Sequence, residues 1–524
     1  MQGRIAAVNA PRLQQHVAAE DQSPVVAYLA SGHPFGEAGV DRRIDTHAAS
    51  VFLSGERAWK LKRAVRYPYL DFSTPEKRRA ALEAELRLNR RTAPDLYLAV
   101  HPITRSGDEL CIGGAGEIVD WVLEMKRFAD GALLDELAAR GPIDPSILLR
   151  LTDHVHAFHD GIVPTIESHG ANRFRDIIEG NASSLGVHAD LFGGDRISRL
   201  VEDQCRACER HAALLDARGR EGRIRHVHGD LHLANIALIE GEPVPFDCLE
   251  FSEELSTIDV LYDLAFLLMD LWHRDLRAGA NLVFNHYIDL SADEEGVRLL
   301  PLFLSMRATI RAHVLATTVA RGGSAATPKQ ATDFLAFAER LITPRSAGLV
   351  AVGGLSGTGK SVLARALGGD CGAPPGARIL RSDVLRKRLA GISSERRLSP
   401  ALYTPRANRT VYELLGTLTS RHLASGTFVI ADAVFADDEE RGMIAHCAAH
   451  AHVPFFGLWL EAPEPIRLSR VARRTADPSD ADADVVRAQS SYRTGALGEW
   501  HRLRADRLPT AVASDARAIV AGTG

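Results

Sequence analysis

The chain has 524 residues, and at roughly 100–200 residues per domain this length predicts about two to four domains. Hydrophobic residues make up 46% and charged residues 25% of the chain, which excludes a mostly disordered protein. The formal net charge of −5, from 62 basic and 67 acidic residues, gives no general electrostatic reason to bind nucleic acid or an anionic membrane surface.

The sequence predicts neither a signal peptide nor a membrane-spanning segment. The first 25 residues contain no continuous apolar segment of a signal peptide, and 6 scattered cysteines are too few for a disulfide scaffold. The most apolar stretch, 260–272, is interrupted by Asp263 and Asp270 and is too short to span a bilayer. These features predict a cytoplasmic protein in a reducing environment.

The first part of the chain is predicted to run from strands through one helix and further strands into many helices. Pro75 suits the first position of a helix, and apolar residues recur at helical spacing after it. The predicted elements are strands at 51–53, 58–62 and 117–128, a helix at 74–91, mostly helical stretches at 144–220 and 257–345, and short apolar runs with turns at 226–247. This order predicts an α+β domain over residues 1–345.

The composition changes at 343–348, which is a predicted linker. After it, strands alternate with helices, and this alternation is typical of a parallel, doubly wound α/β sheet. The predicted strands are 349–352, 378–380, 428–430 and 455–460. The second domain is therefore predicted over residues 346–524.

A glycine-rich segment, GLSGTGKS at 354–361, fits the pattern G-x-x-x-x-G-K-[ST] between a predicted strand and a predicted helix. Backbone N–H groups of such a loop surround phosphate oxygens, and the helix N-terminus adds partial positive charge. Lys360 is expected to reach the β- and γ-phosphates of ATP, and Ser361 to hold Mg²⁺. The alternative is a glycine-rich turn that happens to end in Lys-Ser. The predicted nucleotide-binding residues are Gly354, Ser356, Gly357, Thr358, Gly359, Lys360 and Ser361.

Two further strand ends carry carboxylates that suit phosphoryl transfer. Asp383 is expected to accept the proton of a substrate hydroxyl, and Arg386, on the first turn of the next helix, to hold a substrate anion or the transferring phosphoryl group. Asp432 ends an apolar strand and is a predicted Mg²⁺ ligand. The alternatives are helix caps for both aspartates and a solvent-exposed Arg386.

Arginines cluster after the strand predicted at 455–460. Arg470 and Arg474 share one helical face, with Arg467 and Arg473 beside them. A mobile segment carrying Arg470 and Arg474 would neutralise charge during phosphoryl transfer and exclude water. The alternative is a solvated basic helix.

The second domain resembles the small P-loop kinases of the polynucleotide-kinase, zeta-toxin and chloramphenicol-phosphotransferase type over roughly 348–515. The resemblance rests on GLSGTGKS, SDVLR (382–386), IADAVF (430–435) and RVARRTADPSDAD (470–482). It implies transfer of the ATP γ-phosphoryl group to a hydroxyl and leaves the acceptor open.

The segment HGDLHLAN, 228–235, is the strongest signal in the first half. Asp230 and Asn235 are five residues apart, as in the kinase pattern H-R-D-x-x-x-x-N, and Asp247 follows at the end of an apolar strand. Asp230 is expected to orient and deprotonate an acceptor hydroxyl, and Asn235 and Asp247 to hold Mg²⁺ on the ATP phosphates. The alternative is two unrelated polar turns.

A kinase also needs a cation on the α- and β-phosphates, held by a helical carboxylate. Lys60 and Lys62 lie two apart on a predicted strand and therefore on one face. They stand out because only 7 of the 62 basic residues are lysines. Lys60 is the preferred ATP ligand, with Lys62 open, and Glu85 is preferred over Glu83 as its partner. The alternative is a solvated strand face.

The first domain resembles the aminoglycoside-phosphotransferase or choline-kinase-like family over roughly 40–320. It fits best a bacterial branch often fused to a P-loop kinase domain, with which it shares YLDFSTPEKRR at 69–79 and the pair Asp259 and Asp263. The resemblance implies a protein-kinase-like fold. The sequence departs from the wider kinase pattern because no G-x-G-x-x-G loop precedes Lys60.

Other polar residues favour structural roles. Cys205, Cys208 and His211 have one half of a metal-binding spacing, but helical thiols are the preferred interpretation. The histidines at 154, 156 and 159 are expected on a helix face or in the core, and Asp259 and Asp263 as caps or backbone anchors.

The sequence as a whole predicts a bifunctional ATP- and Mg²⁺-dependent kinase that acts on hydroxyl groups of small molecules, with one site per domain. Two alternatives remain open: one active domain with a regulatory nucleotide-binding partner domain, or a nucleic-acid end kinase or toxin-like modifier.

Overall fold

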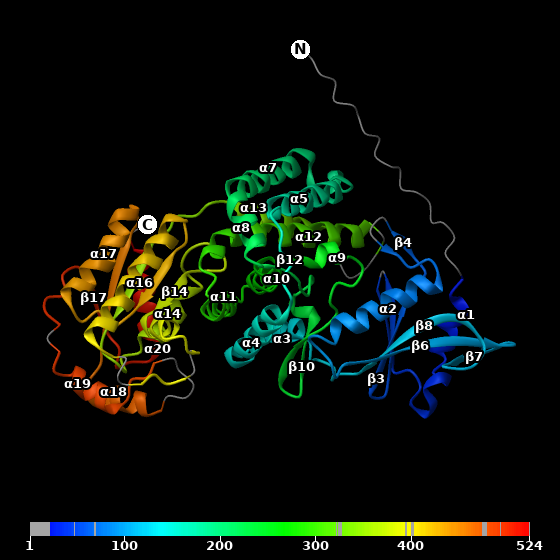
Figure 1. Cartoon of the computed structure of the whole chain (residues 1–524), viewed down its shortest axis with the longest axis horizontal. Coiled ribbons are helices and arrows are strands. Elements are labelled where there is room, and N and C mark those ends of the chain that lie inside the picture. The colour runs from blue at the N-terminus through cyan, green and yellow to red at the C-terminus, as the bar shows by residue number, and fades with distance from the viewer. Residues whose placement is uncertain are drawn as a thin grey trace, which may run out of the picture. The chain divides into compact units, whose positions relative to one another are not determined.

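The computed structural model describes residues 21–522 apart from 47, 68–69, 321, 323–326, 394–395, 400–402, 474–478 and 493. The chain forms two compact units (Figure 1). Unit 1 comprises Met1–Leu133, His228–Asp230 and Asn235–Ser256, and unit 2 comprises Leu134–Val227, Leu231–Ala234 and Thr257–Gly524. The domain boundary predicted at 345 falls inside unit 2 and stays a prediction.

Unit 1 is built on a six-stranded antiparallel sheet with the order β1-β2-β3-β8-β6-β7. Strand β2 pairs Val51 with Lys60 and Ala49 with Lys62, so the two lysines lie on one face of the sheet, as predicted. The strands are β1 Arg42–Asp45, β2 Ala49–Ser54, β3 Arg57–Lys62, β6 Tyr97–Ser106, β7 Glu109–Ile112 and β8 Glu117–Lys126.

Helices cover both faces of this sheet. In β8, Val122 joins a buried cluster with Leu29 of α1 (Ser23–Ala30), whereas its neighbour Leu123 joins one with Leu82 of α2 (Pro75–Asn89). Helix α2 confirms the predicted helix: Thr74 caps it through its side chain, and proline occupies the first turn. The remaining elements of unit 1 are η1 His33–Ala38, β4 Arg66–Tyr67, β5 Leu70–Asp71, β10 Ile236–Ile239, β11 Glu242–Pro245 and α9 Glu253–Ser256.

Unit 2 begins with a helical part, here meaning residues 134–227, 231–234 and 257–342. At its centre Phe174 stacks on Phe303, and Tyr262 meets both rings edge-on, with ring centroids 4.7–5.4 Å apart. Its elements are α3 Leu134–Arg140, α4 Pro145–Gly161, α5 Gly170–Gly186, α6 Ala189–Phe192, α7 Gly194–Arg210, α8 Ala212–Arg220, β9 Ile224–His226, β12 Thr257–Asp259, α10 Val260–His273, α11 Arg277–Ser291, η3 Glu295–Leu299, α12 Leu300–Ala320 and α13 Pro328–Ile342; η2 is Leu233–Asn235. The helical stretches predicted from the sequence are confirmed.

The segment Glu295–Ala320 is long and apolar enough to cross a membrane by length and composition alone. It is mostly buried inside the structure, where α12 packs against α10 and α13. A buried core helix satisfies the same criterion.

The P-loop part, residues 349–522, has a five-stranded parallel sheet with the order β14-β15-β13-β16-β17. Ala351 of β13 packs with Leu415 and Ile444 on one face, and Val350 packs with Leu363 and Val512 on the other. The elements are β13 Leu349–Gly353, α14 Lys360–Gly368, β14 Arg378–Arg381, α15 Ser382–Leu389, α16 Pro405–Ala424, β15 Val429–Asp432, α17 Asp438–Ala451, β16 Phe455–Glu461, α18 Glu464–Ala472, α19 Ala483–Gln489, β17 His501–Arg504 and α20 Pro509–Ala521. The predicted doubly wound parallel sheet is confirmed.

Some local features differ from the predictions. Strand β6 was not predicted from the sequence, because it contains Pro102 and proline argues against a strand interior. Helix α15 begins at Ser382, so Arg386 lies in its second turn and not in the first. The N-cap position of α15 is Arg381, so Asp383 is no cap.

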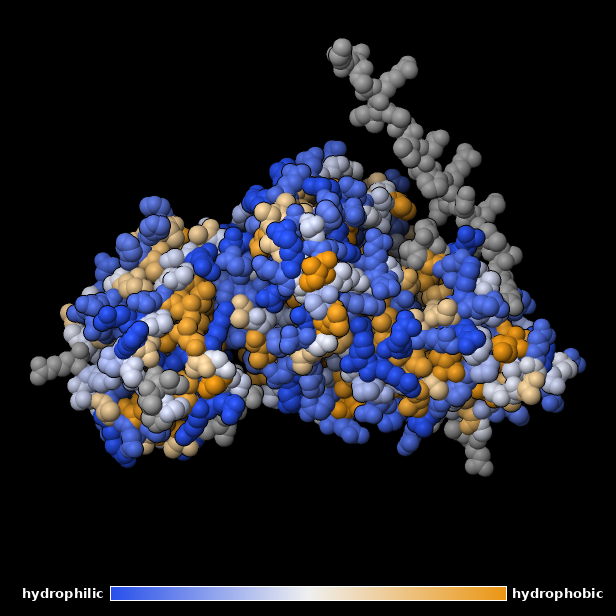
Figure 2. Space-filling view, in the orientation of Figure 1, coloured by the Kyte–Doolittle hydropathy of each residue, from blue (hydrophilic) through white to orange (hydrophobic). Residues whose placement is uncertain are grey.

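The surface mixes polar and apolar residues, as the composition of the chain predicts. On the face drawn in Figure 2, apolar residues occur in small groups among polar ones. Scattered apolar groups of this kind are usual on the surface of a folded protein.

Candidate active sites

The first candidate site, in unit 1, is centred on Lys60. Its Nζ atom lies 2.6 Å from Oε1 of Glu85 and 2.7 Å from Oδ1 of Asp247. Strand β3, helix α2 and the segment after β11 supply these three side chains. The structure therefore brings together three of the residues that the sequence assigned to ATP and Mg²⁺.

Burial and charge act against each other at Lys60. Burial alone would lower the pKa of this ammonium, but Asp247 and Glu85 raise the pKa well above its ordinary value. Burial would raise the pKa of Asp247, but Lys60 lowers it. Lys60 and Asp247 are thus both held in their charged forms, ready to face the charges of a nucleotide.

Lys62 forms a second pair behind the first. Its Nζ atom lies 2.7 Å from Oε2 of Glu85 and 2.5 Å from Oε1 of Glu250. The Lys62 side chain is only 3% exposed, against 12% for Lys60 and 40% for Asp247. Lys60 is therefore the lysine nearer to solvent, and Lys62 fixes Glu85 from the inside.

Asp230 and Asn235 are joined directly. Asn235 donates from Nδ2 to the Oδ2 atom of Asp230 at 2.8 Å and to its backbone oxygen at 3.0 Å. His228, which is fully buried, bonds the backbone oxygen of Phe246 at 2.9 Å. These contacts fix the carboxylate of Asp230 and tie its loop to the segment that carries Asp247.

The backbone at Asp247 adopts a left-handed conformation, with φ of 61°. Non-glycine residues rarely do so, and such strain persists where surrounding contacts hold it. Here the Asp247 N–H donates to the hydroxyl of Tyr97 at 3.1 Å, and the Cys248 N–H donates to Oδ1 of Asn89 at 2.8 Å. Burial and the charges of Asp247 and Glu85 raise the pKa of Tyr97 well above its ordinary value, so its hydroxyl stays protonated.

The donors at this site fit Mg²⁺. Both hydrogen bonds of the Asn235 amide nitrogen go to Asp230, which leaves the amide oxygen as the atom available to a cation. Asp247 contributes a partly exposed carboxylate. In the described part of the chain, no group of three or more His, Cys, Asp or Glu side chains could hold a metal ion alone. A cation here would therefore need phosphate oxygens among its ligands, as magnesium in kinases does.

The second candidate site is the loop between β13 and α14. Gly354 and Gly357 have φ of 136° and 85°, which L-residues rarely adopt. A Cβ atom on Gly354 would lie 2.6 Å from the backbone oxygen of Leu460, and one on Gly357 2.7 Å from that of Arg467. The glycines are thus required both by conformation and by space, as the predicted phosphate-binding loop demands.

Side chains around the loop complete the P-loop site. Ser361 donates from Oγ to Oδ2 of Asp432 at 2.6 Å, which brings the two predicted Mg²⁺ ligands together. Arg381 donates from Nη2 to the same Oγ atom at 3.0 Å. The Ser356 N–H donates to Oε1 of Gln489 at 2.7 Å, and Lys360 lies with Nζ 3.4 Å from the backbone oxygen of Leu355. A serine hydroxyl beside a carboxylate at this place fits Mg²⁺.

Asp383 and Arg386 lie on α15 beside Tyr403. The guanidinium of Arg386 is 4.9 Å from the centre of the Tyr403 ring. Its Nε and Nη1 atoms are buried and make no hydrogen bond to another described residue. Burial, Asp480 and the nearby charge of Asp383 all raise the pKa of Tyr403. A buried guanidinium with two unused donors suits an anionic group of a substrate.

The predicted arginine segment packs close to the loop. Arg470 donates to the backbone oxygens of Thr358 at 3.1 Å and Ala505 at 2.6 Å. Arg467 is 4% exposed and donates to Ser490 at 2.7 Å. Arg474 lies outside the described residues. The structure thus ties Arg470 to the loop backbone, and its role in transfer stays a prediction.

Comparison with known proteins identifies the P-loop domain and a relative of the whole chain. The family model of the AAA domain matches residues 349–495, which confirms the predicted P-loop domain. The "Uncharacterized protein Rv2004c" of Mycobacterium tuberculosis strain H37Rv is 30% identical over 493 residues, which cover 90% of this chain and 95% of that protein. The chain belongs to the family of this mycobacterial protein. The AAA-domain match includes the glycine-rich loop of the second site, at 354–361.

Two solved structures similar to parts of this chain are a choline/ethanolamine kinase family protein and a gluconokinase. A choline/ethanolamine kinase family protein from Mesorhizobium loti is 15% identical, covers 62% of this chain and 95% of its own, and has a TM-score of 0.40. A gluconokinase from Sinorhizobium meliloti is 19% identical, covers 34% of this chain and 94% of its own, and has a TM-score of 0.26. Superpositions this loose indicate neither a substrate nor a mechanism.

Several residues at the two sites were not predicted from the sequence. Glu250 follows Asp247 by three residues, and that proximity is the only sequence signal for it. Arg381 directly precedes the Ser-Asp pair that begins α15, so its place at a strand end was a usable signal. Tyr97 and Gln489 are far from their partners in sequence, so no sequence signal identifies them as site residues.

Residues assigned structural roles have buried partners. His159 contacts Tyr287 at 2.8 Å and Asp263 at 3.1 Å. Asp259 caps α10. Cys208 lies on α7 and is buried, which raises the pKa of its thiol to about 11, so it remains protonated. A protonated thiol is a poor zinc ligand.

Proposed function

We propose that the chain transfers the γ-phosphoryl group of ATP to hydroxyl groups of small molecules at two sites, one in unit 1 and one in the P-loop part. The observation that carries the proposal for unit 1 is the contact of Lys60 with both Glu85 and Asp247. For the P-loop part it is the contact of Ser361 with Asp432 beneath the glycine-rich loop.

At the first site, Lys60 neutralises negative charge on the ATP phosphates, and Glu85 holds Lys60 in place. Asp230 orients the acceptor hydroxyl and accepts its proton as the bond to phosphorus forms. Asn235 keeps the Asp230 carboxylate in one orientation through its hydrogen bond. Asn235 and Asp247 would hold Mg²⁺, which supplies positive charge to the phosphates when bound.

At the P-loop site, backbone N–H groups of the loop and Lys360 bind the phosphates of ATP. Ser361 and Asp432 would hold Mg²⁺. Asp383 accepts the proton of the acceptor hydroxyl, and Arg386 binds an anionic group on the acceptor or on the transferring phosphoryl group. Where Arg386 binds the acceptor, that acceptor carries a carboxylate or phosphate near its reacting hydroxyl.

A second function for the P-loop part has one specific observation in its favour. Arg381 donates to Ser361, whose hydroxyl donates in turn to Asp432, so both predicted Mg²⁺ ligands are already engaged with protein groups. A domain that binds nucleotide without turnover, and regulates the first site, could retain such contacts.

The test measures ADP release from Mg·ATP with a panel of sugars, amino alcohols, nucleosides and hydroxy acids. Wild type is compared with Asp230→Ala and Lys360→Ala, which affect one site each. Two separate activities, each abolished by one variant, are expected. Abolition of all turnover by Asp230→Ala, with Lys360→Ala lowering nucleotide affinity alone, would favour the regulatory alternative.

Failure of every small acceptor to stimulate ADP release would overturn the substrate class. Salt-dependent binding of an oligonucleotide would then support a nucleic-acid end kinase. Exposed Arg487→Lys serves as a control that leaves both activities unchanged, because its ion pair with Asp484 lies in solvent.

A further inference from the structure

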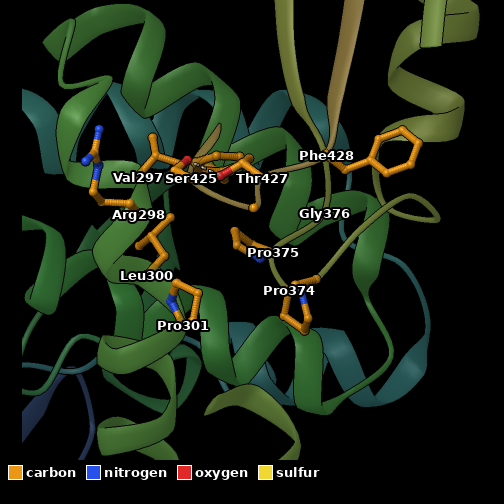
Figure 3. A pocket seen from close by; sticks show the side chains of 13 residues that line it. Val297, Arg298, Leu300, Pro301, Pro374, Pro375, Gly376, Ser425, Thr427 and Phe428 are labelled. Carbon is orange, nitrogen blue, oxygen red and sulfur yellow. Dashed lines mark hydrogen bonds between the residues drawn. The ribbon is translucent and has the colours of Figure 1, made fainter. Parts of the chain in front are cut away.

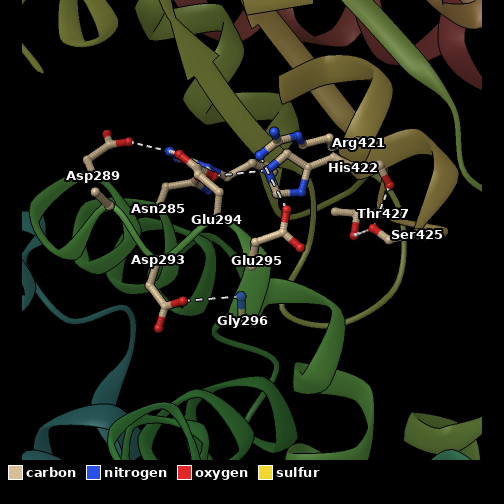
Figure 4. A network of polar contacts seen from close by, with 12 residues as sticks. Asn285, Asp289, Asp293, Glu294, Glu295, Gly296, Arg421, His422, Ser425 and Thr427 are labelled. Atoms are coloured by element: carbon tan, nitrogen blue, oxygen red, sulfur yellow. Dashed lines mark hydrogen bonds and ion pairs between the residues drawn. The ribbon is translucent and has the colours of Figure 1, made fainter. Parts of the chain in front are cut away.

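Side chains of α11, in the helical part, contact the start of strand β14, in the P-loop part; Figure 4 labels Asn285 and Asp289 of α11. Strand β14 is at one end of the sheet order, so only one of its sides pairs with another strand of the described sheet. The other side of an edge strand presents unpaired N–H and C=O groups. In this protein, side chains of α11 bond the Ile379 N–H of β14 and the backbone oxygens of Pro375 and Ala377 just before it.

Two asparagines one helical turn apart make these contacts. Asn285 accepts the Ile379 N–H at its Oδ1 atom, 2.7 Å away, and donates from Nδ2 to the Ala377 oxygen at 3.0 Å. Asn281 donates from Nδ2 to the oxygens of Ala377 at 2.9 Å and Pro375 at 3.1 Å. The amide groups of α11 thus occupy the position that a further strand would take.

A buried arginine strengthens the attachment. Arg378, the first residue of β14, is 1% exposed. Its guanidinium forms two bonds to Glu294, at 2.9 and 3.0 Å, one to Asp289 at 2.6 Å and one to Asn285 at 2.9 Å. A fully paired guanidinium of this kind fixes both position and orientation of the strand end.

Glu294 connects this arginine to two more elements of the P-loop part. Its Oε1 atom accepts from Arg388 of α15 at 2.9 Å, and its Oε2 atom contacts Nε2 of His422 of α16 at 2.9 Å. Burial would raise the pKa of Glu294, but Arg378 and His422 lower it, so the carboxylate stays charged. One buried carboxylate of the helical part therefore holds β14, α15 and α16 together.

The apolar part of the same contact is incomplete. A small pocket of about 50 Å³ lies beside the polar network (Figure 3). Its apolar wall comes from both parts of the chain: Phe284, Leu300, Pro301, Pro374, Pro375 and Phe428. The polar network thus joins α11 to β14 beside a small gap in the apolar packing.

Strand β14 leads directly into the candidate acceptor-binding residues. Asp383 lies five residues after Arg378, and Arg386 lies one turn further along α15. We infer that Asn285 and Glu294 are positioning residues of the P-loop site: they hold β14 and α15 so that Asp383 and Arg386 face the phosphate-binding loop. The inference rests on the function proposed for that site.

This arrangement separates nucleotide binding from positioning of the acceptor. The loop at 354–361 follows β13, in the centre of the sheet, whereas Asp383 and Arg386 follow β14 at its edge. Loss of the α11 contacts therefore affects the proton acceptor and the acceptor-binding arginine more than ATP binding. Misplacement of a catalytic group by about 1 Å costs on the order of 100-fold in rate.

The test compares Asn285→Ala and Glu294→Gln with Glu295→Gln. Glu295 is the matched control because it is the neighbouring carboxylate and pairs with Arg421 of α16, but this pair is 48% and 57% exposed. Hydrogen exchange of the Ile379 amide and its neighbours measures the edge of β14, and kinetics measures the Lys360-dependent activity in the full chain.

The Ile379 amide is expected to exchange at least about 10-fold faster in both variants. In Asn285→Ala the acceptor of its hydrogen bond is lost. In Glu294→Gln the charge that holds Arg378, and with it the contact to Asn285, is lost. The kcat of the Lys360-dependent activity is expected to fall by about 10- to 100-fold and the KM for the acceptor to rise, while the KM for ATP stays unchanged. Glu295→Gln is expected to change neither. A merely structural role would lower the active fraction without raising the KM for the acceptor relative to that for ATP.

Unchanged exchange in both variants, or faster exchange with unchanged kcat and acceptor KM, overturns the inference. Should Glu294→Gln fail to fold, Asn285→Ala carries the test, because it leaves the Glu294 contacts to Arg378 in place. Should wild type show no Lys360-dependent turnover at all, the proposed function of the P-loop site fails, and the exchange result still decides whether α11 holds β14.

Discussion

The Nζ atom of Lys62 lies 2.7 Å from Oε2 of Glu85, the carboxylate whose other oxygen is 2.6 Å from Nζ of Lys60. One buried glutamate thus holds two lysines of the same strand face. Lys60 extends to Asp247, which is 40% exposed, whereas Lys62 extends to Glu250, which is 11% exposed. This asymmetry favours Lys60 as the phosphate ligand and gives Lys62 the task of holding Glu85.

Replacement of Lys60 is therefore expected to lower activity, whereas replacement of Lys62 is expected to lower stability. Lys60→Met is expected to lower kcat/KM of the Asp230-dependent activity by about 100-fold or more, as removal of a preorganised electrostatic group does, with modest loss of stability. Lys62→Met leaves Glu85 and Glu250 buried with one cation fewer, so the free energy of unfolding is expected to fall by about 3–5 kcal/mol. Urea unfolding and ADP release measure both effects.

Lys77→Met provides the control for this pair. Lys77 also contacts a carboxylate, Asp71 at 2.6 Å, but the two side chains are 48% and 33% exposed. Its loss is expected to change the free energy of unfolding by less than about 1 kcal/mol. Equal losses of stability in Lys62→Met and Lys77→Met would contradict the role given to Lys62.

The sequence predicted the local chemistry of both sites because each depends on short spacings. Asp230 and Asn235 are five residues apart, and Lys60 and Lys62 share a strand face, so periodicity alone brings each pair together. The glycine-rich loop is predictable for the same reason, since its conformation requires glycine at fixed positions.

The remaining contacts depend on long-range packing. Glu250 meets Lys62, and Glu294 meets Arg378, across 188 and 84 positions of sequence. No spacing rule in a single sequence links such residues. Glu294 also follows directly on Asp293, which pairs instead with Arg218, so adjacent carboxylates serve different partners. The packing of the helices determines that Asp293 pairs with Arg218 and Glu294 with Arg378.

Replacement of Gly357 tests the loop itself. An alanine at φ of 85° costs about 1–2 kcal/mol by conformation, and its Cβ would lie 2.7 Å from the backbone oxygen of Arg467. Gly357→Ala is therefore expected to weaken ATP binding at the P-loop site at least about 10-fold, measured by titration with a fluorescent ATP analogue in a Lys60→Met background.

Gly442→Ala is the matched glycine control. Gly442 lies inside α17, and nothing comes within 4 Å of a Cβ placed there. The substitution is expected to raise the free energy of unfolding by about 0.5–1 kcal/mol and to leave ATP binding unchanged. Unaltered ATP affinity in Gly357→Ala would mean that the loop does not contact the phosphates.

Arg386→Lys tests the anionic acceptor. Lysine keeps the charge but loses the planar fork and the contact with the Tyr403 ring, 4.9 Å away. Hydrogen bonds to charged groups contribute about 1.5–3 kcal/mol, so kcat/KM for the acceptor is expected to fall by about 10- to 100-fold. The KM for ATP should not change, and acceptors lacking the anionic group should lose nothing further. An unchanged kcat/KM with the anionic acceptor would remove Arg386 from the site.

The stability of unit 2 is expected to depend on pH through the buried side chain of His313. Burial, with a smaller contribution from His188, lowers the pKa of His313 from 6.5 to about 4. Between these values the unfolded chain binds a proton that the folded chain does not, so folding is disfavoured as the pH falls. The contribution of His313 is fully present above pH 6.5 and is lost progressively as the pH falls through 6.5 towards about 4.

Urea unfolding of wild type and His313→Gln at pH 7.5 and pH 5 measures this contribution as a difference, because the carboxylates titrate alike in both proteins. The free energy of unfolding is expected to fall less between these pH values in His313→Gln than in wild type. His450→Gln is the control, since His450 is exposed on α17. Identical pH dependence in wild type and His313→Gln would show that His313 takes up its proton in the folded chain, and that the contact of its Nε2 atom with Oδ1 of Asn181, 3.3 Å away, then includes a charged donor.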